Sequence, residues 1–157
     1  MRFVYKSLLS LLLVCLAASS AVAVGEERGT PREAKALLQE AVALLESEGA
    51  EKALSQFNDR KSRFSRGDLY IFAMDLEGSY LASGANLGLV GQNFFKQHAA
   101  AGREIDRDML MVPNDGDRDI FEYEWLNRKT NKLETKFSYV QRIGEIVLGV
   151  GIYVPSS

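Results

Sequence analysis

The sequence of 157 residues has the length of one domain. Its 46% hydrophobic and 25% charged residues are ordinary for a globular chain and argue against a wholly disordered one. One cysteine and one histidine exclude disulfide frameworks, zinc sites of the cysteine–histidine type and most nucleophile–histidine catalysis. The formal net charge is -2, so the composition offers no net basic surface for nucleic acid.

The first 23 residues have the pattern of a secretory signal peptide. Arg2 and Lys6 precede the apolar residues 7–18, and Ala21-Val22-Ala23 has the small-x-small form of a cleavage site. The apolar run is shorter than the roughly 20 residues of a bilayer-spanning helix. We therefore expect cleavage after Ala23 and a periplasmic or secreted domain of residues 24–157. The alternative is an uncleaved signal anchor with the domain facing the periplasm.

The mature chain opens with a predicted helix. Thr30 is a candidate N-cap, Pro31 suits the first helical position, and Glu33 completes a capping box. Apolar residues at helical spacing then continue to Gly49, which is a candidate helix end. A second, shorter apolar stripe continues to Phe57.

The rest of the chain has the texture of strands joined by short connections. Five strands are expected, over residues 69–75, 79–83, 120–126, 133–142 and 145–154, with a loop over 86–93 and a broken helical region over 94–111. Short connections between consecutive strands favour antiparallel hairpins. The predicted fold class is α+β, with a long N-terminal helix packed on a mostly antiparallel five-stranded sheet.

Several segments in this order resemble single Cache domains of the second subtype, a PAS-like extracytoplasmic sensor family. Residues 49–58 are similar to its "G-x-E-K-A-L-x-x-F-N" helix, and residues 69–72 with Asp75 and Gly78 resemble its first hairpin. Further matches lie in the loop at Asn86, 89–91 and Asn93, in the hairpin from Tyr123 to Val140, and in the closing strand at Gly149 and 151–153. Together the matches run from about Gly49 to Tyr153.

The sequence departs from the family pattern at positions near the expected pocket. Ser83-Gly84 stands where a His-Pro pair is usual, Leu87 and Arg128 replace prolines, and Gln92 replaces a lysine. An aspartate-rich stretch of the family is missing, and residues 96–102 run through that region. The shape of the pocket and the identity of its ligand are therefore left open by the resemblance.

The resemblance implies that a small organic molecule, such as a carboxylate or an amino acid, binds on one face of the sheet. Alternation places Phe121, Tyr123 and Trp125 on one face of their strand, where aromatic rings can wall a pocket. Lys136 is expected near the mouth of this pocket, where its ammonium can hold a carboxylate and its loss leaves the fold intact. The alternative for these residues is an aromatic core beside a solvated lysine.

Two further tyrosines complete the predicted site. Tyr139 lies three residues after Lys136, so a regular strand points it to the opposite face. Tyr70 shares a face of its strand with Phe72 and Met74, for which core packing is the favoured interpretation. The predicted ligand-binding residues are Tyr70, Tyr123, Trp125, Lys136 and Tyr139.

No residue set indicates catalysis, a metal or a cofactor. Asp115, Asp117 and Asp119 begin like a calcium loop, but Ile120 and Leu126 stand where glycine and glutamate are needed. Glu122 and Glu124 resemble an ordinary solvated strand face, and the only histidine, His98, is expected on a helix surface or in the core. The predicted function is a sensor that signals through a membrane receptor or kinase, with homodimerisation open. A non-catalytic interaction module without a functional pocket is the alternative.

Overall fold

The fold is described from a computed structural model, in which residues 28–103, 105, 107–113 and 119–154 are described. The predicted signal peptide lies outside these residues, as do Asp115 and Asp117. Within this part of the chain, no helix is long and apolar enough to cross a membrane.

The N-terminal helix α1 runs from Pro31 to Asn58. Its predicted start is confirmed, because the Thr30 side chain accepts from the Glu33 backbone N–H and the Glu33 side chain accepts from that of Thr30. The predicted helix end at Gly49 is confirmed, because its backbone is not helical and α1 consists of two helical segments that meet at this kink. Gly49 takes a positive φ of 80°, and the chain resumes the helix directly after this kink.

The sheet contains the five predicted strands and one short additional strand among the described residues. Its strands are β1 (Ser65–Arg66), β2 (Leu69–Met74), β3 (Tyr80–Ser83), β4 (Asp119–Asn127), β5 (Lys132–Ile143) and β6 (Ile146–Val154). The spatial order is β1-β2-β6-β5-β4, β3 also pairs with β2, and every pairing is antiparallel. The sequence missed β1 because two residues carry no alternation pattern.

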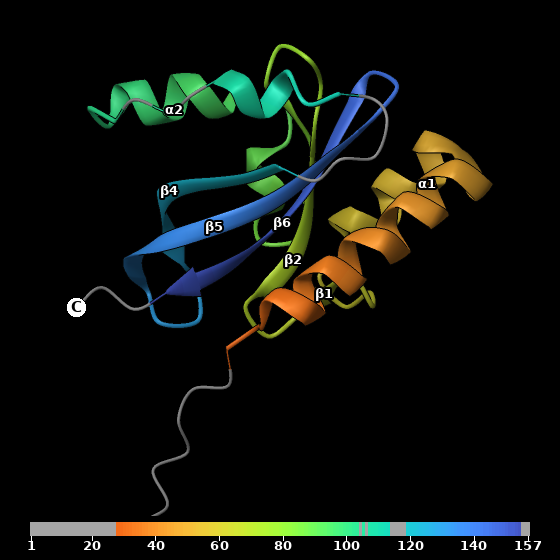
Figure 1. Ribbon diagram of the computed structural model, residues 1–157, viewed down its shortest axis with the longest axis horizontal. Coiled ribbons are helices and arrows are strands. Elements are labelled where there is room, and N and C mark those ends of the chain that lie inside the picture. Colours follow the sequence, from red (N-terminus) through yellow and green to blue (C-terminus); the bar gives the residue numbers. More distant parts are fainter. Residues whose placement is uncertain (1–27, 104, 106, 114–118, 155–157) are drawn as a thin grey trace, which may run out of the picture.

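The two faces of the sheet are covered by different parts of the chain (Figure 1). Helix α1 packs on one face, where Leu37, Leu38 and Phe57 meet Ile71 of β2 and Val150 of β6. The opposite face is covered by helix α2 (Phe94–Ala100) and the short 3-10 helices η1 (Leu87–Leu89) and η2 (Arg107–Leu110). The sheet therefore has one aliphatic face under α1 and one aromatic face under α2.

Candidate functional site

Lys136 lies inside the aromatic face, with 1% of its surface exposed. It stands on β5 opposite Tyr153 of β6. A glycine makes room for its stem, because a Cβ atom on Gly151 would lie 2.2 Å from Lys136 Cε. The position of Lys136 thus depends on the absence of a side chain at a neighbouring position of β6.

The prediction that Lys136 lies at a pocket mouth and outside the core is wrong. Lysine side chains are usually solvated, so the residue type alone favours an exposed position for Lys136. Here the rings of Tyr70, Phe72, Tyr123 and Tyr153 surround the ammonium, with Nζ 4.3 Å to 5.9 Å from the four ring centroids. Truncation to alanine would therefore leave a cavity, which costs about 2 kcal/mol or more of stability.

The Lys136 ammonium is held by hydroxyl groups and ring faces. Its Nζ donates to the Tyr70 hydroxyl at 2.8 Å, and among the described residues no carboxylate lies within ion-pair distance of it. Burial alone would lower the pKa of Lys136, but the contacts with Tyr123 and Tyr70 outweigh it and hold the pKa above its usual value. The site therefore contains a buried positive charge with no negative partner in the described part of the chain.

A chain of hydroxyl groups extends from the ammonium. The Tyr70 and Tyr153 hydroxyls are 3.0 Å apart, and Tyr153 also reaches the Leu126 carbonyl at 3.4 Å. Because Lys136 donates to the Tyr70 oxygen, Tyr70 can donate to Tyr153, and the Tyr153 hydrogen is left with only the long contact to Leu126. This order of donation leaves a positively polarised O–H group at the end of the chain.

The two hydroxyl-bearing residues, Tyr70 and Tyr153, also line a cavity that opens toward solvent. Cationic Arg60, Arg128 and Lys129 stand around it. The remaining lining residues are Ser65, Gly67, Asp68, Gly84, Ala85 and Asn127. A ligand in this cavity would meet a cationic rim and, inside it, the tyrosine hydroxyls connected to Lys136.

The structure brings together three of the five residues proposed as a ligand site. Tyr70, Tyr123 and Lys136 converge on the aromatic face, and the Tyr123 hydroxyl lies 2.7 Å from Ser138 Oγ. Trp125 shares that face, but its ring stacks on His98 at 5.0 Å between centroids. Tyr139 lies on the opposite face, packed in the α1 core with Lys35 Nζ 5.1 Å from its ring centroid.

His98 is buried within this aromatic cluster, as one of the two placements expected from the sequence. One percent of its surface is exposed, and it lies beside Phe94, Tyr123 and Trp125. Neither ring nitrogen has a hydrogen-bond partner in the described part of the chain. Burial, followed by the nearby Arg103 charge, lowers the pKa of His98 to about 4. His98 is therefore neutral at pH 7.

Of the residues that line the cavity, the sequence interpretation proposed only Tyr70 for the site and missed, among others, Tyr153 and Asp68. Tyr153 was recognised only as part of the closing strand, and Asp68 carried no signal. A signal was present in β6, where Gly149 and Gly151 occupy the two positions before Tyr153 on the same face of the strand. Glycines at such positions indicate that side chains of neighbouring strands lie across β6, as those of Phe72 and Lys136 do. Among the residues that the structure describes, no cluster of His, Cys, Asp and Glu could hold a metal ion.

The sequence matches the family model described as "Single Cache domain 2" over residues 29–155. This match spans the helix, the sheet and the aromatic face. No curated protein matches the sequence.

Solved structures of sensor proteins share the fold, and three of them show the extent of the likeness. A methyl-accepting chemotaxis protein from Vibrio parahaemolyticus has a TM-score of 0.63 at 23% identity, over 78% of this chain and 86% of its own. A periplasmic sensor domain of a chemotaxis protein has a TM-score of 0.57 at 20% identity, over 79% of this chain and 90% of its own. A Cache chemosensory domain, solved to explain carboxylic acid recognition, has a TM-score of 0.56 at 21% identity, over 79% of this chain and 88% of its own. At these identities the likeness concerns the fold.

Proposed function

Because the chain belongs to the single Cache domain 2 family, we propose that it is an exported sensor that binds a small organic carboxylate. The site includes Lys136, Tyr70 and Tyr153, with Tyr123 closing the wall beside the ammonium. The ligand is bound and released unchanged, and the domain signals through a separate membrane receptor or kinase.

The observation that carries this proposal is the buried ammonium of Lys136 without a carboxylate partner among the described residues. A buried charge without a counter-ion is energetically costly. An anion that reaches the hydroxyl chain of Lys136 therefore interacts more favourably with this charge than it would with an ammonium in water. The cationic rim of the cavity raises the local concentration of anions and favours their entry. The carboxylic acid recognition reported for one structural neighbour supports the same class of ligand.

A thermal-shift screen tests the proposal. Mature protein is heated with each of a set of organic acids and with matched amides or alcohols of the same carbon skeleton. We expect at least one acid to raise the melting temperature, since a ligand that binds only the folded state stabilises it. The neutral analogue should have no effect. If no acid shifts the melting temperature, the proposal fails and the interaction module becomes the better interpretation.

The proposed location depends on removal of the first 23 residues. We expect the exported protein to begin at Val24, because Ala21 and Ala23 provide the small side chains that a cleavage site requires. Intact-mass measurement of the secreted or periplasmic fraction checks this. Recovery of the full-length chain from the membrane fraction would instead support the signal anchor.

A further inference from the structure

The end of the β4–β5 hairpin exposes apolar side chains. Leu126 and Leu133 face each other across the two strands and are 39% and 50% exposed. Val154 of β6 pairs with Thr135, two residues after Leu133, and is 41% exposed on the same face of the sheet. Leu126, Leu133 and Val154 thus form one apolar strip, called the hairpin strip below. Contiguous exposed apolar surface on a globular domain marks a site of interaction.

The turn that joins the two leucines is cationic. Residues 127–132 read Asn-Arg-Lys-Thr-Asn-Lys, with three basic residues and no acid. The three basic side chains are exposed and belong to Arg128, Lys129 and Lys132. The first acid after the turn, Glu134, is buried and pairs with Arg28 at 2.6 Å, which offsets its charge. The hairpin strip therefore lies beside a local positive charge, although the chain as a whole is slightly acidic.

A hollow of about 200 Å³ opens at the same end of the hairpin. Its walls are formed by Leu89, Arg103, Trp125, Leu126, Arg128 and Leu133. A guanidinium group matches the geometry of a phosphate, and apolar walls can accept part of an acyl chain. The hollow therefore suits a molecule that joins an anionic phosphate to an apolar chain, as a phospholipid does.

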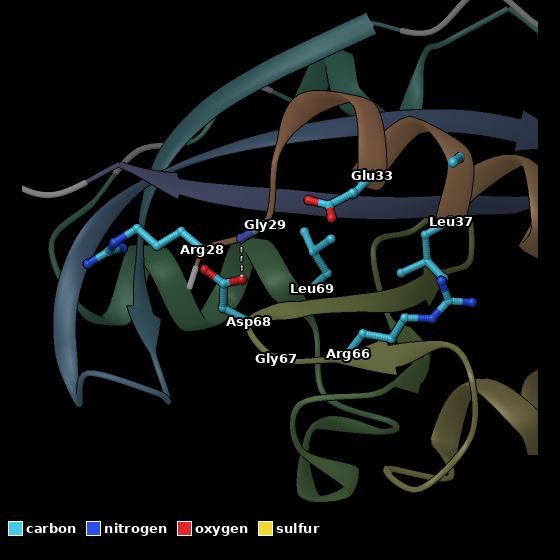
Figure 2. Close-up of a pocket in the computed structure, with 9 residues that line it drawn as sticks. Arg28, Gly29, Glu33, Leu37, Arg66, Gly67, Asp68 and Leu69 are labelled. Atoms are coloured by element: carbon cyan, nitrogen blue, oxygen red, sulfur yellow. Dashed lines mark hydrogen bonds between the residues drawn. The ribbon is translucent and has the colours of Figure 1, made fainter. Parts of the chain in front are cut away.

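The hairpin end is also next to the N-terminal segment of the chain. Arg28 donates to Glu134, the residue after Leu133. Figure 2 shows the Arg28 side chain extending away from the pocket that Glu33 lines at the start of α1. Residues 19–27 separate Arg28 from the apolar run of the predicted signal peptide and span at most about 30 Å. Before cleavage, this end of the domain is therefore held close to the membrane.

We propose that the end of the β4–β5 hairpin binds the surface of an anionic phospholipid membrane, with the hairpin strip among the acyl chains and the cations of the turn against the phosphates. Apolar insertion and attraction to anionic lipids are the contributions that hold a peripheral protein on a membrane. Arg128 and Lys129 also line the proposed ligand cavity, so this contact places the cavity beside a membrane-bound partner. The inference does not depend on which ligand the cavity binds.

Vesicle sedimentation tests the inference on exported protein from which residues 1–23 have been removed. We expect vesicles that contain phosphatidylglycerol to bind at least about tenfold more tightly than vesicles of phosphatidylcholine alone, because each cation of the turn is attracted to an anionic surface. Raising the ionic strength should weaken this binding. Leu126→Ser combined with Leu133→Ser should lower the affinity for anionic vesicles by about tenfold or more, because serine gains little from leaving water.

Ile120→Ser is the matched control, because Ile120 is exposed on the same face of β4 but lies about 20 Å from Leu126 along the strand. It should bind anionic vesicles as wild type does.

Lys129→Glu combined with Lys132→Glu changes only exposed side chains and should abolish the preference for anionic vesicles. Melting curves establish that each variant is folded. The inference is overturned if wild type binds neither kind of vesicle or both equally, if the leucine or lysine variant binds as wild type does, or if Ile120→Ser loses as much affinity as the leucine variant. A protein partner then becomes the occupant of the hairpin strip.

Discussion

Lys136→Met should weaken carboxylate binding by about tenfold to a hundredfold and leave the protein as stable as wild type or more so. The affinity falls because methionine cannot donate to Tyr70, so the hydroxyl chain loses its positive end. The stability is kept because methionine fills the volume of the lysine stem. Replacing a buried charge by an apolar side chain of similar size is often neutral or stabilising. Calorimetric titration and urea unfolding measure the two effects.

Lys132→Met is the matched control, since Lys132 begins the same strand but is exposed. It should change neither affinity nor stability by much. Wild-type affinity in Lys136→Met would show that the carboxylate binds elsewhere. A large loss of stability in that variant would show that the ammonium maintains the fold rather than the ligand site.

Alternation in the sequence was sufficient to predict how the strands present their side chains. Phe121, Tyr123 and Trp125 share the aromatic face as expected. Tyr70 and Phe72 also lie on this face, contributed by β2, which is two strands away from β5. Such placement follows from the local period of two residues and needs no knowledge of the tertiary structure.

The burial of Lys136 and Asp68 could not be predicted in the same way. Each depends on contacts between segments that are distant in the chain. The Lys136 stem fits because Gly151 of β6 lacks a side chain, and the ammonium donates to the hydroxyl of Tyr70, 66 residues earlier. Asp68 is held by Gly29, 39 residues before it. A single sequence shows a lysine and an aspartate, which are usually exposed, and does not show which partners enclose them.

Lowering the pH from about 6.5 to 4 should remove about 3 kcal/mol of folding stability through His98 alone. In the unfolded chain His98 has a pKa near 6.5, whereas in the fold its pKa is about 4. Between these values the unfolded state binds a proton that the folded state does not, so stability is full above pH 6.5 and falls as the pH decreases. Urea unfolding at intervals across this range measures the loss.

His98→Leu supplies the comparison that assigns this loss to one group. Leucine is neutral at every pH and suits a site between Phe94 and Trp125, where neither histidine nitrogen has a partner in the described chain. The variant should therefore be much less sensitive to pH between 6.5 and about 4.5. Glu134 does not obscure the result, because hydrogen bonds from Arg28, Thr130 and Asn127 lower its pKa to about 2. Its contribution is lost only below about pH 4.5. Equal pH dependence in wild type and His98→Leu would mean that His98 takes up its proton as readily in the fold as in the unfolded chain, and that the aromatic cluster under α2 opens to water.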